Sequence, residues 1–408
     1  MKKFLCYVFF VVLLFVIISC KEKNTIKVGI LRPSNIYAGE MIEKGALMAV
    51  EEINSTGGIN GKMIEVLLID DFNKPDMGRV NLEKAIKDDD IDYIIGGMKS
   101  EVVLECMDVM AKYKKIWLGT GGATPLVIKK IKDNYDAYKY YFRVGTIDST
   151  YQGKEGANFV INFLAKEYNI KNIAYIGADH VYSKFMIDTT EKELSGSGFK
   201  TVYKNFIPVE TTDFQMVIQD IINSKPDVVF QAWPSVEALA FTKAYNKNKV
   251  PAILIGPVIE SLKDEYFEET GGACVYEVTF SPQSGPGPIT RKTLIFSKNF
   301  KSKYGKSAGY IAYPAYDAVY ILKTALEKAK DYMDVVKVLE TIDYEGNIWY
   351  SFTENHDLVM GKHNNKFYGT FVWFQWMEDG TRKAVYPLEF KQADFVTPPW
   401  IRKDILKK

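Results

Sequence analysis

Short β-branched runs alternate with amphipathic stretches along most of the chain. In the first third, apolar runs at 26–31, 64–69, 93–95 and 116–118 are separated by stretches in which apolar residues recur three or four positions apart. That spacing covers one face of a helix, whereas an uninterrupted apolar run is typical of a strand buried on both faces. The alternation predicts parallel strands with helices on both sides of the sheet.

A second series with the same alternation begins after Phe142-Arg143-Val144. Its apolar runs lie at 173–176, 201–206, 228–230 and 252–255, again separated by helical patterns. A chain of 408 residues exceeds the usual size of one domain. The sequence therefore predicts an α/β protein with two doubly wound parallel-sheet lobes.

The last third follows a different pattern. After a Pro/Gly-rich loop at 282–288, two strong helical patterns occupy 312–329 and 332–342. Strand-like aromatic segments follow at 348–352 and 371–376, and the end of the chain at 391–408 reads as a loosely docked tail.

The first twenty residues resemble an export signal. Lys2 and Lys3 precede an uninterrupted apolar stretch from Phe4 to Ile18, which is the length of a signal-peptide core and short for a bilayer span. Ile17-Ile18-Ser19-Cys20 resembles a bacterial lipobox, so we expect residues 1–19 to be a cleaved signal peptide and Cys20 to carry a lipid. The alternative is an uncleaved membrane anchor, and both place the remaining chain outside the cytoplasmic membrane.

Charge and cysteine content indicate which binding partners are expected and whether disulfides are needed. Removing the leader takes two lysines from 52 basic residues, which leaves 50 against 51 acidic residues and a formal charge of −1. Nothing in that balance favours nucleic acid. With 47% hydrophobic residues the chain can bury a core without disulfides, and Cys106 and Cys274 stand among apolar neighbours, where a buried free thiol is common.

The run from Gly45 to Lys62 carries the strongest single signal. Its apolar positions fit one helix face, Gly57-Gly58 ends the helix, and Asn60-Gly61 makes a tight turn into the next strand. This run resembles the first helix and turn of the Leu/Ile/Val-binding family of type I periplasmic solute-binding proteins. Further segments match the family in order from Ile26 to about Pro387: Asp70-Asp71 with Pro75, Phe142-Arg143 with Asp148 and Gln152-Gly153, Thr212-Asp213-Phe214, Lys225 to Phe230, Tyr316-Asp317-Ala318, and Phe374-Gln375-Trp376 with Asp379-Gly380.

The resemblance implies two lobes joined by three crossover strands. We expect the crossings near Gly145, Val278 and Tyr350. The first lobe would then comprise 20–145 and 278–348, and the second lobe 146–277 and 349–390.

A ligand carboxylate is expected at two loops of the first lobe. The segment 96–100 ends a strand and opens a helix, so it presents backbone N–H groups and the Ser100 hydroxyl at the carboxyl edge of the sheet. By resemblance Ser100 holds the ligand carboxylate, although a plain helix N-cap is the alternative. Gly121, Gly122, Ala123 and Thr124 form the family's second carboxylate loop; this segment resembles a dinucleotide fingerprint only superficially, since Thr124 replaces the final glycine and Pro125 follows.

Aromatic and acidic residues complete the expected cleft. Tyr37, Tyr182 and Trp233 lie near strand ends where the family closes over the ligand side chain, although packing is the commoner role of any one aromatic residue. The family places a glutamate directly after Gly256-Pro257 to pair with a ligand ammonium, but here that position is Val258. Glu260, two residues later, either reaches the site or caps a helix near Ser261 and faces water.

The resemblance implies an extracytoplasmic solute-binding lipoprotein of an ABC importer. It would act as a monomer, capture a branched-chain or other amino acid, or a related organic acid or amide, and deliver it to permease subunits in the membrane. No cofactor, metal or catalytic group is expected, because the three histidines lack ligand spacing and no nucleophile–base pair stands out. A ligand-sensing receptor subunit of the same fold and an extracellular hydrolase are the alternatives.

Overall fold

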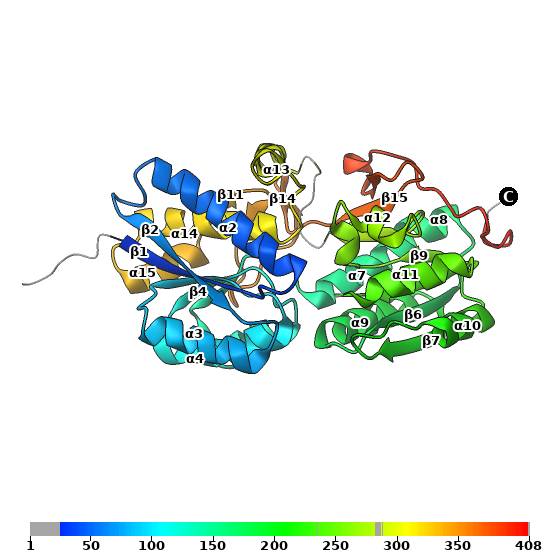
Figure 1. Ribbon diagram of the computed structural model, residues 1–408, viewed down its shortest axis with the longest axis horizontal. Coiled ribbons are helices and arrows are strands. Elements are labelled where there is room, and N and C mark those ends of the chain that lie inside the picture. The colour runs from blue at the N-terminus through cyan, green and yellow to red at the C-terminus, as the bar shows by residue number, and fades with distance from the viewer. Residues whose placement is uncertain (1–24, 235, 282–286, 288, 407–408) are drawn as a thin grey trace, which may run out of the picture.

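Two lobes lie side by side in the computed structural model, which describes residues 25–234, 236–281, 287 and 289–406 (Figure 1). The predicted signal peptide and Cys20 lie outside the described residues, as does most of the Pro/Gly-rich loop. No helix within the described ranges has the length and apolar character needed to cross a membrane.

The first lobe is built on a five-stranded parallel sheet in the order β2-β1-β3-β4-β5. Its strands are β1 Thr25–Arg32, β2 Met63–Asp70, β3 Tyr93–Gly96, β4 Ile116–Gly119 and β5 Tyr141–Arg143. Its helices are α2 Tyr37–Ser55, α3 Pro75–Lys87, α4 Ser100–Tyr113, α5 Pro125–Asp133 and α6 Tyr135–Tyr138. Helix α2 covers one side of the sheet while α3 and α4 cover the other, as the strand–helix alternation predicts (Figure 1).

The second lobe has a seven-stranded sheet in the order β16-β15-β10-β9-β8-β6-β7. Its parallel strands are β6 Asn172–Ala178, β7 Lys200–Ile207, β8 Val228–Ala232, β9 Ile253–Ile255 and β10 Val278–Ser281. The hairpin β15 Val372–Trp376 and β16 Arg382–Tyr386 adds two antiparallel strands, so this sheet is mixed and not purely parallel. A tight turn at Asp379-Gly380 reverses the chain and fixes that antiparallel pairing.

Helices cover both faces of the second sheet. They are α7 Ser149–Phe159, which continues as a π-helix Val160–Leu164 and α8 Ala165–Glu167, then α9 Val181–Gly196, α10 Gln215–Ser224, α11 Glu237–Lys247 and α12 Tyr266–Thr270. Successive residues of β6 enter different cores: Ile173 and Tyr175 belong to a large cluster shared with the first lobe, and Ala174 and Ile176 to a separate one. A strand buried on both faces explains the continuous apolar run in the sequence.

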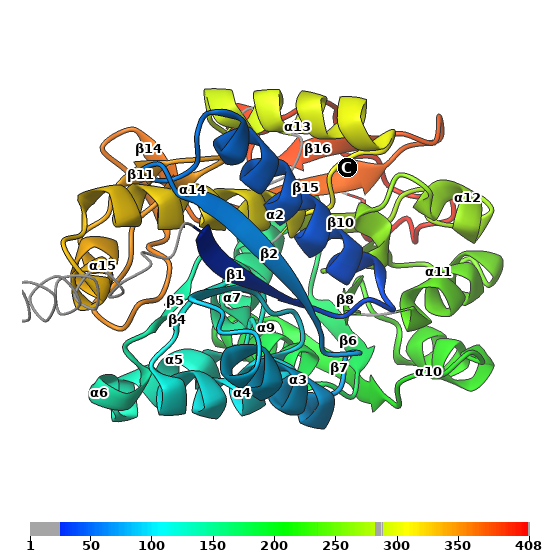
Figure 2. The ribbon, with the colours of Figure 1, turned by 60° about the vertical axis from the view of Figure 1, so that its left-hand side comes forward.

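The chain returns to the first lobe after β10. Helices α13 Arg291–Tyr304, α14 Ala312–Lys328 and α15 Tyr332–Glu340 follow, and α14 lies along α2 (Figure 2). A small sheet then forms in the order β11-β12-β14-β13, from Tyr344–Glu345, Trp349–Tyr350, Lys366–Tyr368 and Gly361–His363. Because Tyr350 belongs to this small sheet, the strand that rejoins the second lobe is β15, later than the crossing expected near Tyr350.

A turn beside the small sheet covers the edge strand β5. The Arg143 amide donates to the carbonyl oxygen of His356 at 3.0 Å, and the His356 ring stacks on Phe142 with centroids 3.9 Å apart. His356 is fully buried, and its Nδ1 lies 3.1 Å from the carbonyl oxygen of Tyr141. This contact brings the neighbouring Asp357 to the end of the first sheet, where the chain crosses between lobes.

Candidate functional site

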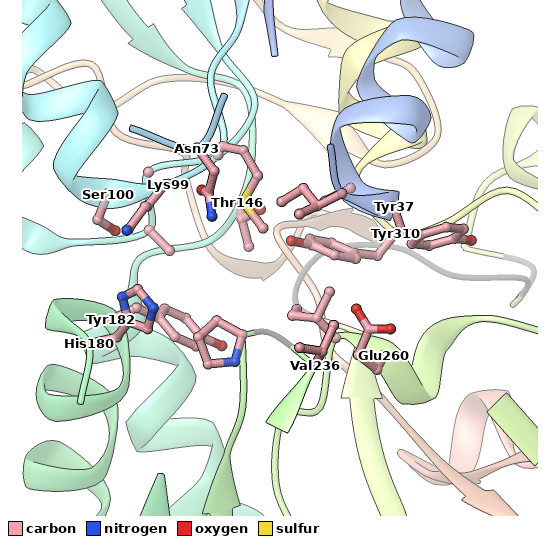
Figure 3. Close-up of a pocket in the computed structure, with 18 of the residues that line it drawn as sticks. Tyr37, Asn73, Lys99, Ser100, Thr146, His180, Tyr182, Val236, Glu260 and Tyr310 are labelled. Carbon is pink, nitrogen blue, oxygen red and sulfur yellow. The ribbon is translucent and has the colours of Figure 1, made fainter. Parts of the chain in front are cut away.

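A cavity of about 270 Å³ lies between the two lobes (Figure 3). Its walls are segments at the carboxyl ends of parallel strands: 35–38 after β1, 98–101 after β3 and 121–123 after β4 in the first lobe, and 180–182 after β6 and 259–263 after β9 in the second. Open α/β sheets bind ligands at this edge. Asn73 after β2, Pro234 and Val236 after β8, Thr146 from the first crossover and Tyr310 from the returning chain complete the lining.

The beginning of α4 forms one end of the cavity. Gly96 and Gly97 have φ of +101° and +89°, and a Cβ atom on Gly97 would stand 2.8 Å from the Trp117 ring, so the turn requires glycine. Lys99 is the N-cap residue and Ser100 is the first residue of the helix. The Ser100 hydroxyl has no hydrogen-bond partner among the described residues and lines the cavity, so the plain N-cap interpretation of Ser100 does not hold.

The loop after β4 forms the adjoining wall. Gly121, Gly122 and Ala123 line the cavity, and the Gly122 amide donates to the carbonyl oxygen of Met98 at 2.8 Å. A Cβ atom on Gly121 would lie 2.4 Å from the carbonyl oxygen of Gly97, so only glycine permits the two loops to touch. Thr124 lies outside the lining: its fully buried hydroxyl accepts from the Leu126 amide at 3.3 Å and caps α5.

Arg143 stabilises this loop by hydrogen bonds to its backbone. The fully buried guanidinium donates to the carbonyl oxygens of Gly122 at 2.7 Å and Thr124 at 3.0 Å. Its Nε lies 2.7 Å from Asp357 Oδ1, and Nη2 lies 3.8 Å from Asp148 Oδ2. A planar guanidinium can donate to both carbonyl oxygens while it faces the two carboxylates, so Arg143 fixes the loop relative to the crossover. The sequence identified Arg143 only as part of a family motif.

Tyrosines line the middle of the cavity. Tyr37, Tyr182 and Tyr310 come from the first lobe, the second lobe and the returning chain respectively, and Figure 3 shows their rings around the cleft. The Tyr182 hydroxyl donates to Gln152 Oε1 at 2.8 Å. Burial raises the pKa of all three hydroxyls, so they face the cavity as neutral groups. Tyr310 carried no sequence signal of its own.

Trp233 lies in the core of the second lobe and not in the cavity lining. Its fully buried ring packs against Phe214 and Phe241, with centroids 5.7 and 5.3 Å away, and its Nε1 donates to Gln231 Oε1 at 2.9 Å. The next residue along the chain that lines the cavity is Pro234. Side chains alternate across an extended segment, so a shift of one residue moves an aromatic ring from the cleft to the core.

The segment after β9 forms the far end of the cavity. Val258, where the family has its glutamate, is fully buried and donates its amide to Thr279 Oγ1 at 3.2 Å. Glu260 begins a 3-10 helix, Glu260–Leu262, and lines the cavity with a residue exposure of 6%, so its side chain turns inward and does not face open water. Its carboxylate forms an ion pair with Lys263.

A carboxylate–imidazole contact bridges the lobes. Glu101 on α4 lies 3.4 Å from His180 Nδ1 in the second lobe, and both residues line the cavity. The cavity thus has hydrogen-bond donors at the Ser100 end, aromatic and apolar walls in the middle, and the Glu260–Lys263 pair at the other end (Figure 3). Such an arrangement can orient a small molecule that is polar at one end.

Comparisons with known proteins agree with this architecture. Residues 25–381 match the family model described as periplasmic binding protein. The Pseudomonas aeruginosa leucine-, isoleucine-, valine-, threonine- and alanine-binding protein is 24% identical over 89% of this chain and 92% of its own length. The Streptococcus pneumoniae branched-chain amino acid transporter binding protein LivJ, solved with isoleucine, superimposes with a TM-score of 0.74 at 21% identity, covering 89% of this chain and 100% of that one. A solute-binding protein from R. palustris solved with benzoate gives a TM-score of 0.74 at 17% identity, covering 92% and 99%.

Proposed function

The chain belongs to the periplasmic binding protein family, and on that premise we propose that it captures a small carboxylate-bearing ligand between its lobes. The ligand would be a branched-chain or other amino acid, or a related organic acid or amide. Relatives of this chain are named for leucine, isoleucine and valine, and solved neighbours hold isoleucine or benzoate. These molecules share one carboxylate and an apolar body.

The observation that carries the proposal is the donor cluster at the Ser100 end. The first turn of α4 has backbone N–H groups without intrahelical acceptors, and the helix dipole favours an anion there. The Ser100 hydroxyl faces the same space, and the Gly121–Ala123 loop allows a ligand to approach the backbone closely. Lys99, at the helix start, adds a positive charge to the lining.

The size and walls of the cavity favour a small ligand. At about 270 Å³ it lies just below the range of about 300–1,000 Å³ that is typical of drug-sized ligands. Apolar atoms of Ile36, Met98 and Ile259 and the tyrosine rings line the space beyond the carboxylate end. Closure of the lobes around such a ligand would be a population shift toward the state with more contacts.

We place the protein outside the cytoplasmic membrane, anchored by a lipid on Cys20. The support is the lipobox-like end of the apolar leader together with membership of a periplasmic family. The ligand would pass to the permease subunits of an ABC importer; this role is supported by structural neighbours named as a transporter substrate binding protein and as a putative ABC transporter.

A thermal-shift screen of amino acids, aromatic acids, amides and 2-oxo acids tests the proposal. A ligand at 100 times its dissociation constant should raise the free energy of unfolding by about 2.7 kcal/mol. Ser100→Ala should reduce that response, whereas Ser224→Ala, whose hydroxyl bonds only its own helix far from the cavity, should not. The proposal fails if no carboxylate stabilises the protein, or if the two variants respond alike.

A further inference from the structure

Two acidic side chains, Glu101 and Glu260, are among the described residues that line the cavity. Glu101 follows Ser100 in the first turn of α4, and Figure 3 shows Ser100 and Glu260 at opposite ends of the cavity. The ammonium of an α-amino acid is bonded to the carbon that carries the carboxylate. A ligand whose carboxylate binds at the Ser100 end therefore holds its ammonium near Glu101 and away from Glu260.

The Ser100 hydroxyl is an enclosed donor beside Glu101. Ser100 is 5% exposed and lines the cavity, and its hydroxyl has no hydrogen-bond partner among the described residues. Lys99, the N-cap residue, lines the same space. Lys99, Ser100 and Glu101 thus present a cation, a hydroxyl and an anion beside the free backbone N–H groups of α4. A zwitterionic head group carries the complementary charges.

Glu101 stays an anion and can accept a further hydrogen bond. Burial raises its pKa, but contacts with His180 and with its own backbone amide outweigh burial, so the pKa of Glu101 lies below its ordinary value. His180 Nδ1 lies 3.4 Å from Glu101 Oε1. An imidazole can donate a hydrogen bond while it is neutral, so this contact does not cancel the carboxylate charge. Two carboxylate oxygens offer about four lone-pair sites, which leaves room for a ligand ammonium.

The second lobe offers no anion at this end of the cavity among its described lining residues. Val258, where the family has its glutamate, is fully buried and donates its amide to Thr279 Oγ1. Glu260 is ion-paired with Lys263, whose ammonium also lies 5.1 Å from the centre of the Tyr37 ring. An anion for a ligand α-ammonium would therefore come from the first lobe, which also holds the carboxylate.

We propose that Glu101 is the anionic partner of a ligand α-ammonium, so that the first turn of α4 recognises both charges of a zwitterionic head group. This assignment deepens the proposed function and rests on it, because it assumes that the ligand carboxylate binds beside Ser100. A 2-oxo acid would place its carboxylate near Glu101 without a positive charge to offset the repulsion. His180, from the second lobe, contacts the same carboxylate and orients it across the cleft.

Matched ligand pairs test the role of Glu101. Leucine, valine and phenylalanine are each compared by calorimetry with the 2-oxo acid of the same carbon skeleton, with benzoate as a further acid. In the wild type the amino acid of a pair should bind at least about tenfold more tightly than its 2-oxo acid, because only the amino acid brings a counter-charge to Glu101. The ratio of the two dissociation constants is the readout, since loss of folded protein affects both ligands equally.

Glu101→Gln should move the two ligand classes in opposite directions. The substitution keeps the size of the side chain but removes its charge, so the amino acid should bind less tightly, the 2-oxo acid more tightly, and the ratio should fall at least about tenfold. Glu101→Asp keeps the charge on a shorter stem and should retain part of the preference. Glu105→Gln is the matched control, because Glu105 lies one turn further along α4, is 47% exposed and pairs with Arg79 without lining the cavity. That variant should keep the wild-type ratio.

A purely structural role of Glu101 would weaken both ligands alike in Glu101→Gln and leave the ratio unchanged, which would overturn the inference. A wild type that binds 2-oxo acids or benzoate but no amino acid would also overturn it, as would a ratio that falls in Glu260→Gln and not in Glu101→Gln. In each of these cases a carboxylate still binds, so the proposed function stands. Failure of every carboxylate to bind overturns both.

Discussion

Arg143→Met is the substitution with the largest expected effect on both fold and site. The guanidinium is fully buried, donates to the carbonyl oxygens of Gly122 and Thr124, and pairs with Asp357 at 2.7 Å. Methionine fills much of the volume but provides no donor. The substitution therefore leaves the two carbonyl groups without this donor and removes the ion pair of the Asp357 carboxylate, which, among the described residues, keeps only the hydrogen bond from the Leu358 amide.

The expected loss of stability is about 3–5 kcal/mol, the range seen when one partner of a buried ion pair is removed. Each carbonyl group left unsatisfied adds to the desolvation penalty, although the contributions are not additive. Arg143→Lys should lose less, because it keeps the charge near Asp357, but a single ammonium group cannot reproduce the planar fork that reaches both carbonyl oxygens. Ligand affinity should fall in both variants, since the Gly121–Ala123 wall loses its support.

The loss should depend on pH in a defined direction. Burial raises the pKa of Asp357, and the Arg143 charge opposes that rise, so the pKa should climb further in Arg143→Met. The folded variant then holds a proton that the unfolded chain, with an Asp pKa of about 3.9, has released. The difference in the free energy of unfolding between wild type and variant should be largest at neutral pH. It should become smaller as the pH falls through the raised pKa of Asp357.

Urea unfolding followed by circular dichroism from neutral to acidic pH, with calorimetry of a bound carboxylate, measures both effects. Arg402→Met is the matched control: Arg402 donates to the carbonyl oxygens of Lys225 and Pro226 and pairs with Asp227, but it lies away from the cavity. It should lower stability without changing ligand affinity. A folded Arg143→Met protein with unchanged affinity, or a deficit that does not vary with pH, would refute the reasoning.

Three further predictions concern single groups. Ser100→Ala should weaken carboxylate binding by about 1–3 kcal/mol, because a charged group loses a hydrogen bond, and calorimetry showing unchanged affinity would exclude Ser100 from the site. Cys20→Ser should abolish lipid attachment and the associated cleavage, which membrane fractionation and mass spectrometry of the N-terminus can check. Burial raises the pKa of Glu277 to about 7, so the folded protein keeps a proton that the unfolded chain releases, and stability should decline as the pH rises toward 7. In Glu277→Gln that decline should be smaller, and an identical pH profile would contradict this assignment.

The fold and the first-lobe half of the site could be predicted because local signals determine them. Alternation of apolar runs with helical spacing identified the two doubly wound lobes, since burial on both faces requires such runs. The glycines at 96–97 and 121–122 marked places where the backbone must approach closely, and the structure brings them together beside Ser100. The family model matches residues 25–381, a range that includes these segments.

Tertiary structure decided which strand-end residues face the cavity. Trp233 and Thr124 both follow strand ends, where side chains can line the cavity. However, the Trp233 ring packs into the core of the second lobe, and the Thr124 hydroxyl caps α5. The sequence pattern alone does not determine this, because neighbouring residues at a strand end point in opposite directions. A shift of one residue therefore moves a side chain from the cleft into the core. The small sheet around Tyr350 likewise comes from pairings between short segments that carry little signal individually.

The chemical character of the site also depends on contacts between distant residues. Sequence specified that Glu260 stands near Gly256-Pro257, but only the fold turns it inward, joins it to Lys263 and sets Lys263 against Tyr37 of the other lobe. In the same way Arg143 meets Asp357, 214 positions later, because the returning chain covers the edge of β5. Hydrophobic periodicity and turn residues determine structure over a few positions, so their effects can be predicted from the sequence. Charge pairing and burial act through space, so they are defined only once the lobes have assembled.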